Sequence, residues 1–274
     1  MKTSSAHQLS TDVPALAHPL DDDRSGRFLS TAMPILTLLC LVAIWEALVR
    51  WFEIQSWLLP APSEIGRMAV EWRRELAWHS AVTLYETTVG FGLSLLVGVP
   101  LAVAVVYSRI LQNTIYPILL ALQSMPKVAI APLLTLWIGF GALPKIVVVF
   151  LVCFFPIVVA TTSGLATVRP VFLELVQSLC ATSLQVFVKV RFPSAMPSIF
   201  VGMKIAITLA VIGAVIGEFV GAQDGLGYLI LISSTQSRTA LAFAALVLLT
   251  LMSIVLYYAI ELLEHVVAPW GARR

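Results

Sequence analysis

Long, nearly uncharged apolar runs constrain this chain more than any other feature of its sequence. They lie at about 28–49, 81–107, 115–140, 143–166, 198–220 and 241–263. An α-helix needs about 20 apolar residues to cross a hydrocarbon core of about 30 Å. Backbone groups in lipid must be hydrogen-bonded within their own segment, which favours helices. The sequence therefore predicts an all-α integral membrane protein with six transmembrane helices.

Composition supports this class and excludes several others. Of the 274 residues, 59% are hydrophobic and 12% are charged, which is unlike a water-soluble domain. The three cysteines are an odd set, and Cys40 and Cys153 fall inside apolar runs, so we expect neither a disulfide framework nor a metal site. The four histidines are scattered without ligand spacing. We expect no cofactor and no nucleic-acid partner.

The parts outside the spans have their own signals. Residues 1–27 are polar and predict a disordered tail without a cleaved leader, followed by a transmembrane domain at 28–268 and a short end at 269–274. After the first span, Pro60 and Pro62 interrupt the helical structure. Ser63 is placed to cap an amphipathic interfacial helix that reaches about Trp78.

The positions of lysine and arginine predict the orientation. Six spans put both termini on one side of the membrane, together with the segment at about 167–197. Nine basic residues fall on that side and six on the other, and three of the six lie in one helix beside glutamates. Basic residues are more frequent in cytoplasmic loops. We therefore expect both termini and the 167–197 segment to be cytoplasmic.

The third span is interrupted by the run QSMPKVAIAP. Pro126 and Pro132 each remove a backbone donor, so the helix must kink there. Lys127 lies within this break, and a charge deep in the membrane is costly. It is therefore expected to face the bundle interior, a water-filled path or a carboxylate.

The candidate residues for a translocation path are polar side chains within spans: Gln123, Ser124, Lys127, Glu86 and Glu218. Lys127 could attract an anionic solute along a path, or it could form a structural pair with Glu86 or Glu218. Glu218 could be a gate residue or an ion-pair residue. The residues alone leave these alternatives open.

Small residues mark helix contacts. Gly213, Gly217 and Gly221 recur every four residues in the fifth span and form a ridge on one helix face. This ridge favours close packing, either within the subunit or across a dimer.

The stretch from Glu174 to Pro197 is the longest charge-bearing interruption after residue 80. Its pattern predicts one or two short helices at a membrane surface, which Pro193 and Pro197 are expected to end. Glu174, Cys180 at a position where glycine is usual, Val190 and the Phe192-Pro193 pair resemble the EAA loop of binding-protein-dependent ABC transporter permeases.

This resemblance implies a role for the loop. In that family the loop forms a coupling helix that sits in a groove of a cytoplasmic ATPase, with Glu174 here capping or pairing at the helix start. The residues that would carry this contact are Glu174, Ser178, Cys180, Ala181, Thr182, Ser183, Lys189 and Pro193.

Most of the chain outside the N-terminal tail resembles the nitrate, sulfonate and taurine permeases, including a Leu-Pro-Ala-Pro turn at 59–62. This resemblance implies the bundle of a type I ABC importer in a bacterial inner membrane. It also implies a second permease copy, two ATPase copies and an extracytoplasmic solute-binding protein. The solute would be small and either anionic or an aromatic heterocycle, and it would move by alternating access.

No GxxxxGK[ST] phosphate loop occurs in the sequence, so ATP hydrolysis is expected in a separate subunit. No catalytic motif points to an enzyme. The alternative is an ATP-independent secondary transporter or channel, which would show repeats or more charges within the spans.

Overall fold

The computed structural model describes residues 23–168 and 170–270, and these residues form helices joined by short connections. The chain divides into two units, 1–48 and 49–274. The first unit holds most of α1 (Asp23–Trp51), which contains Pro34 and is apolar enough to span a membrane from Met33 onward. This helix includes residues 23–27 of the predicted disordered tail. Residues 1–22 of that tail lie outside the described residues, as do Arg169 and residues 271–274.

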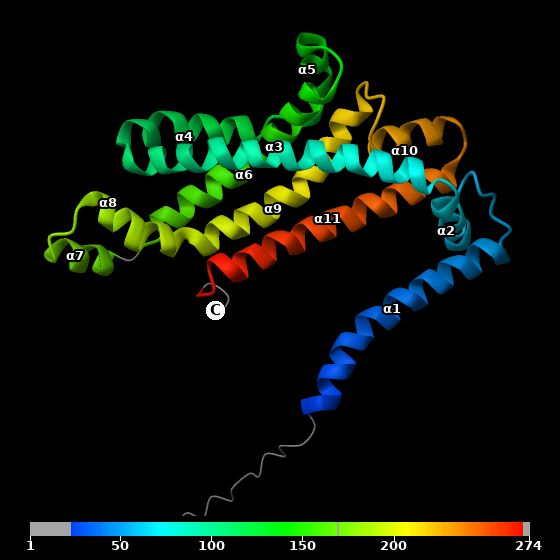
Figure 1. Cartoon of the computed structure of the whole chain (residues 1–274), viewed down its shortest axis with the longest axis horizontal. Helices are drawn as coiled ribbons and strands as arrows, with labels where there is room; N and C mark the ends of the chain where they lie inside the picture. Colours follow the sequence, from blue (N-terminus) through cyan, green and yellow to red (C-terminus); the bar gives the residue numbers. More distant parts are fainter. Residues whose placement is uncertain (1–22, 169, 271–274) are drawn as a thin grey trace, which may run out of the picture. The chain divides into compact units, whose positions relative to one another are not determined.

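The second unit is a helical bundle (Figure 1). Its elements are α2 (Pro62–Glu71), α3 (Arg73–Tyr107), α4 (Arg109–Gln123), η1 (Lys127–Ile130), α5 (Ala131–Ile138), α6 (Ala142–Ala166), α7 (Pro170–Ser178), α8 (Ser183–Val186), η2 (Phe187–Arg191), α9 (Phe192–Phe219), α10 (Leu226–Thr235) and α11 (Thr239–Val267). In the described part of the chain, five helices are long and apolar enough to cross a membrane, and one bent pair brings the number to six. The predicted all-α membrane fold is confirmed.

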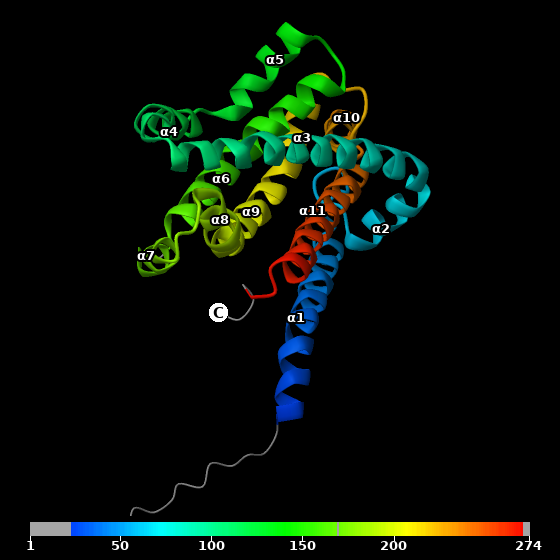
Figure 2. The same ribbon diagram turned by 60° about the vertical axis from the view of Figure 1, so that its left-hand side comes forward.

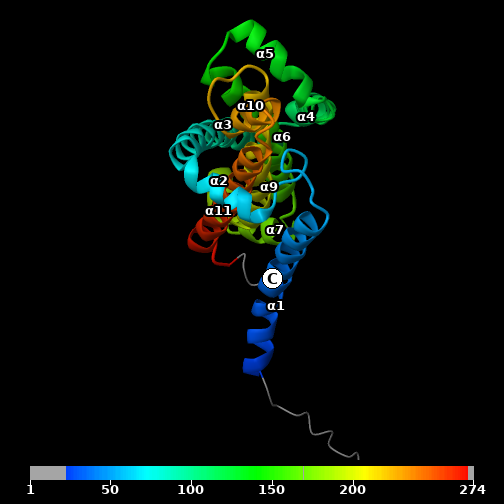
Figure 3. The ribbon, with the colours of Figure 1, turned by 90° about the vertical axis from the view of Figure 1, so that its right-hand side faces the viewer.

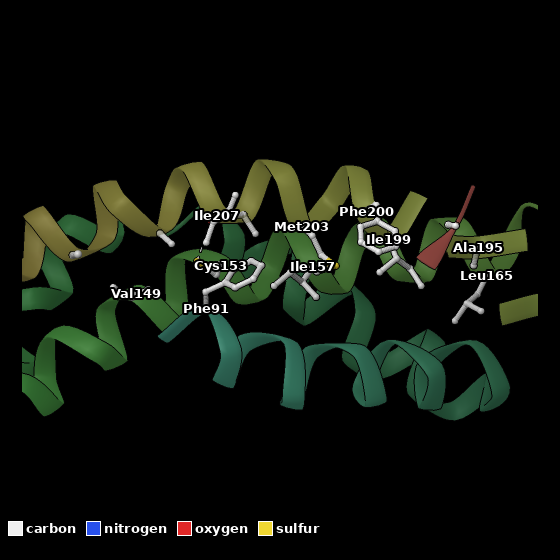
Figure 4. Close-up of a cluster of buried hydrophobic side chains, with 14 residues drawn as sticks. Phe91, Val149, Cys153, Ile157, Leu165, Ala195, Ile199, Phe200, Met203 and Ile207 are labelled. Atoms are coloured by element: carbon white, nitrogen blue, oxygen red, sulfur yellow. Dashed lines mark hydrogen bonds between the residues drawn. The ribbon is translucent and has the colours of Figure 1, made fainter. Parts of the chain in front are cut away.

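Helix α6 lies at the centre of the bundle, between α3 and α9. Val149, Cys153 and Ile157 of α6 are buried, and they form one apolar cluster with Phe91 of α3 and Ile207 of α9 (Figure 4). Helix α6 is apolar on nearly every face because it has neighbours on both sides. Helices α10 and α11 also pack against α9.

Glycines let α9 approach α6 closely. A Cβ atom on Gly217 would lie 3.0 Å from Lys145 Cα, and one on Gly213 would lie 3.2 Å from Val149 Cα. These two glycines therefore pack within the subunit, which answers one question that the sequence left open. Gly221 is different, because α9 ends at Phe219 and Gly221 follows it with a φ of 128°. It belongs to the turn after the helix and not to the ridge.

The predicted interfacial helix is shorter than expected. Helix α2 begins after Ala61 with Pro62 in its first turn, so Ser63 is not its cap. The helix ends at Glu71, and Trp78 already belongs to α3. Pro62 explains the earlier start, because its missing N–H costs nothing in a first turn. Helix α2 packs against α11, and Figure 3 shows both.

The third span is bent sharply. Helix α4 and the η1–α5 segment meet at an angle of 87° around Pro126 (Figure 2). The predicted interruption is therefore confirmed at Pro126. Pro132 has a different effect, since it lies in the first turn of α5 and begins a helix instead of breaking one.

The prediction that Pro193 and Pro197 end the surface helices is wrong. Residues Ser183–Phe219 form one continuous helical stretch, with Pro193 in the first turn of α9 and Pro197 inside it. Pro197 has no N–H to donate to the Pro193 carbonyl. Trp270 Nε1 donates to that carbonyl instead, at 3.1 Å. The C-terminal tryptophan thus satisfies the group that proline leaves unpaired.

Candidate functional site

The residues predicted to contact a partner lie in the 170–191 segment, which comprises α7, α8 and η2 at one end of the bundle. Helix α10 lies at the other end (Figures 1 and 2). Seven of the predicted residues fall within the segment, namely Glu174, Ser178, Cys180, Ala181, Thr182, Ser183 and Lys189, and Pro193 follows it.

The turn between α7 and α8 has a backbone conformation that favours glycine, although Cys180 stands there. Cys180 has a φ of 53°, in the left-handed region. Ala181 N donates to Val176 O at 3.3 Å, which is the bond of a Schellman turn closing α7. Glycine is the usual residue at the left-handed position of such a turn. Cys180 therefore adopts the glycine conformation while carrying a side chain.

Helix α8 starts with a capping box. Thr182 Oγ1 accepts from Gln185 N at 3.3 Å, and Gln185 Oε1 accepts from Thr182 N at 2.9 Å. This reciprocal pair fixes the start of a helix of only four residues. The turn and the cap together give the segment a defined surface at Ala181, Thr182 and Ser183.

Glu174 lies inside α7, and its side chain is exposed. It does not cap the start of the helix as expected, because α7 begins four residues earlier at Pro170. The segment also exposes apolar side chains, with Leu175 56%, Leu179 73% and Leu184 71% exposed. Exposed apolar surface of this kind is typical of a site that contacts another protein or the membrane.

A second polar arrangement lies at the opposite end of the bundle, where α10 begins. Three consecutive backbone N–H groups there are bound by side chains from other helices. Gly225 N donates to His79 Nδ1 at 3.0 Å, and Leu226 N donates to Thr83 Oγ1 at 2.8 Å. Gly227 N donates to Glu218 Oε2 at 2.6 Å. The start of α10 is thereby tied to both α3 and α9.

Glu218 is fully buried and has a further partner. Its Oε1 accepts from Thr83 Oγ1 at 2.6 Å, so one carboxylate links all three helices. A carboxylate at a helix N-terminus is also favoured by the helix dipole. This geometry makes Glu218 a residue that connects α3, α9 and α10.

Glu86 of α3 forms an ion pair with Lys145 of α6. Their side chains are 0% and 8% exposed, and both line a cavity of about 310 Å³ with Phe140 and Asp224. Glu218 is near enough to interact electrostatically with both. A pair so deeply buried stabilises the protein only while both partners are present.

The five path candidates do not converge on one place. Gln123, Ser124 and Lys127 lie at the bend between α4 and η1. Lys127 Nζ donates to Gln123 O at 3.2 Å and lies 5.3 Å from the centre of the Phe155 ring. The predicted partners Glu86 and Glu218 belong to the cluster around Lys145 instead.

Sequence reasoning missed His79, Thr83 and Lys145. Lys145 stands near the start of a span and is one of the six basic residues that the sequence predicts on the side opposite the termini. A signal was nevertheless present, since a carboxylate within a neighbouring span requires a cationic partner. Among residues 23–168 and 170–270, no group of three or more His, Cys, Asp or Glu side chains could hold a metal ion.

Comparison with protein families identifies the family to which this chain belongs. Residues 94–270 match the model of the binding-protein-dependent transport system inner membrane component. The chain belongs to this family. It is therefore a membrane-spanning permease component, and in such transporters the ATPase is a separate subunit.

Other permeases of the family are similar over nearly their whole length. The formylaminopyrimidine transport permease ThiX of Halalkalibacterium halodurans is 36% identical over 242 residues, covering 88% of this chain and 96% of the relative. The riboflavin permease RibX of Chloroflexus aurantiacus is 34% identical, covering 86% and 89%. The taurine permease TauC of Escherichia coli is 25% identical, covering 85% and 88%.

A solved structure shares the fold. The methionine ABC transporter MetNI in an inward-facing conformation matches with a TM-score of 0.60 at 22% identity, over 68% of this chain and 92% of that chain. The chain is thus a permease subunit with the fold of type I ABC importers.

Proposed function

We propose that this permease imports a small solute by alternating access, driven by a separate ATPase that docks on the 170–191 segment. The observation that carries the proposal is the exposed apolar surface of Leu175, Leu179 and Leu184. The Schellman turn at Cys180 and the capping box at Thr182 fix its backbone, so the surface is preorganised for a partner.

The same segment provides a route for coupling. Helix α8 continues through η2 into α9 without a break, and α9 carries Glu218 at its far end. Closure of two docked ATPases would move α8, and α9 would transmit that movement to the start of α10. With the ATPases in the cytoplasm, the 170–191 segment and both termini would lie on that side of the membrane. A second copy of this chain completes the pathway, and an extracytoplasmic binding protein delivers the solute to the α10 end.

We assign the solute class from the names of the relatives. The formylaminopyrimidine and riboflavin permeases are 36% and 34% identical, whereas the taurine permease is 25% identical. An aromatic nitrogen heterocycle is therefore favoured over a sulfonate.

Co-purification with the candidate ATPase tests the docking surface. Leu184→Glu and Ala181→Glu place a charge on the segment, and Leu58→Glu is the matched control, since Leu58 is 64% exposed outside the spans. Wild type and the control should retain the ATPase, while both segment variants should lose it although they still insert and purify as folded protein. Retention by all four proteins would exclude docking here. An ATP-independent transporter would then become the better account.

Uptake by vesicles containing the permease, the ATPase and the binding protein tests the solute. Formylaminopyrimidine, riboflavin and taurine would be supplied separately, with and without ATP. ATP-dependent uptake of a heterocycle and not of taurine is expected. Uptake of taurine alone would contradict the assigned class while leaving the docking result intact.

A further inference from the structure

A cavity of about 240 Å³ lies at the end of the bundle that carries the 170–191 segment. It is formed where α3 and α6 end, beside the first turn of α4 and the last residue of η2. Part of its lining is apolar and includes Val105, Leu165 and Val168. The other part consists of the polar residues Gln112 and Arg191, together with Thr162.

Two polar atoms of this lining are buried without a hydrogen-bond partner. They are Arg191 Nε and Thr162 Oγ1. The hydroxyls of Thr114 and Thr250, by contrast, donate to the carbonyl four residues earlier in their own helices. Buried polar groups are normally paired, so two orphaned groups around one cavity indicate an absent hydrogen-bonding partner. Because an Arg Nε–H can only donate, that partner must be an acceptor.

The charge of the cavity indicates which kind of acceptor it binds. Arg191 Cζ lies 5.4 Å from the centre of the Tyr107 ring, which holds the guanidinium group beside the cavity. No carboxylate lines the cavity, and Arg191 has no ion pair among the residues that the structure describes. The site is therefore cationic and uncompensated. An oxyanion is the acceptor that best complements an arginine in such a place.

The position of the cavity identifies the source of the oxyanion. Helix α3 ends at Tyr107 and α6 ends at Ala166, so the cavity lies at the ends of two helices that are long and apolar enough to cross a membrane. Lipid phosphates lie near the ends of membrane spans, and basic pockets between transmembrane helices bind anionic headgroups. The apolar part of the lining suits the acyl chains of the same lipid.

We propose that this cavity binds the phosphate group of an anionic phospholipid, through Arg191 and Thr162. Arg191 supplies the charge and a donor, and Thr162 supplies a second donor. Gln112, which is exposed at the opening, is placed to contact the headgroup. The lipid would then connect η2 to the ends of α3 and α6.

Binding of phosphatidylglycerol to the delipidated full-length chain, measured by native mass spectrometry, tests this proposal. Losing one charge-assisted hydrogen bond should weaken binding roughly tenfold in Arg191→Gln, and losing a neutral one should weaken it roughly threefold in Thr162→Val. Arg109→Gln is the control, because Arg109 is exposed in the first turn of α4 and does not line the cavity. It should bind as the wild type does. Zwitterionic phosphatidylcholine should bind more weakly than phosphatidylglycerol to the wild type.

Two results would overturn the proposal. Equal binding of phosphatidylglycerol to the wild type, Arg191→Gln and Thr162→Val would show that the lipid does not use this cavity. If inorganic phosphate alone bound in an Arg191-dependent way while lipid binding did not depend on Arg191, the oxyanion would be a free solute. Thr162→Val is close to isosteric, so it remains informative if Arg191→Gln does not fold. The readout is lipid binding, which is independent of ATPase docking and of uptake.

Discussion

Lys145 of α6 forms an ion pair with Glu86 of α3 in the interior of the bundle, where the two side chains are 8% and 0% exposed. Removing two charges from water is costly, and their attraction offsets that cost only while both are present. The pair therefore fixes how α3 and α6 face one another.

Replacing one partner of this pair should be far more harmful than replacing both. We expect Lys145→Met or Glu86→Gln alone to lower the free energy of unfolding by about 3–5 kcal/mol, since each leaves a buried charge uncompensated. The double variant should recover most of the loss. Unfolding of the four proteins in detergent completes the double-mutant cycle. Strictly additive losses would show that the two side chains do not interact.

Glu218 should matter through the backbone that it binds. In Glu218→Ala, the N–H of Gly227 loses its acceptor, while the hydroxyl of Thr83 keeps the His79 carbonyl, so the free energy of unfolding should fall by about 1–3 kcal/mol. Hydrogen exchange should also rise first at the start of α10. Glu71→Ala, an exposed site on α2, should leave both measurements unchanged. Unaltered exchange in α10 would contradict the connecting role.

The turn at Cys180 offers a stabilising substitution. A side chain in the left-handed conformation costs roughly 1 kcal/mol, which glycine does not incur. Cys180→Gly should therefore raise the thermal unfolding midpoint of the 170–191 segment. Limited proteolysis at increasing temperature measures this midpoint. Leu179→Gly is the comparison, because Leu179 does not have a positive φ, and it should lower the midpoint. A lower midpoint for Cys180→Gly would contradict the strain argument.

Adding a methyl group should have opposite effects on stability at Gly217, where α9 packs closely on α6, and at Gly92 of α3, which has open space. The Cβ of Gly217→Ala would lie 3.0 Å from Lys145 Cα, so the helices must separate, and the free energy of unfolding should fall by about 1–3 kcal/mol. Gly92→Ala meets nothing within 4 Å and should raise it by up to about 1 kcal/mol through helix propensity. Equal effects at the two sites in detergent unfolding would refute this packing.

The spans could be predicted because length and apolarity are local properties of the sequence. The bend at Pro126 was predictable for the same reason, since a missing donor acts where it stands. Pro197 shows the limit of that reasoning. Its helix continues, and Trp270, distant in the sequence, donates to the carbonyl of Pro193. Local rules cannot anticipate a donor supplied by another part of the fold.

The candidate sites also have features that the sequence predicts and features that depend on the fold. The 170–191 segment could be located from its polarity and its resemblance to the EAA loop, but its capping box depends on the conformation at Thr182. The partner of Glu86 could not be chosen from the sequence, because Lys127 and Lys145 both lie in or near spans. Only the packing of α3 on α6 selects Lys145. The fold itself was predictable, while the pairing of side chains between helices was not.

The helical stretch Ser183–Phe219 has a mechanical consequence. It contains 37 residues without a break, and at about 1.5 Å per residue it is roughly 55 Å long. A rod of that length converts a small tilt at one end into a displacement at the other. A tilt of about 5° would move the Glu218 end by roughly 5 Å, about one helical turn of rise. The hydrogen bonds that Glu218 makes with Thr83 and Gly227 could not survive such a movement unless α3 and α10 moved with it.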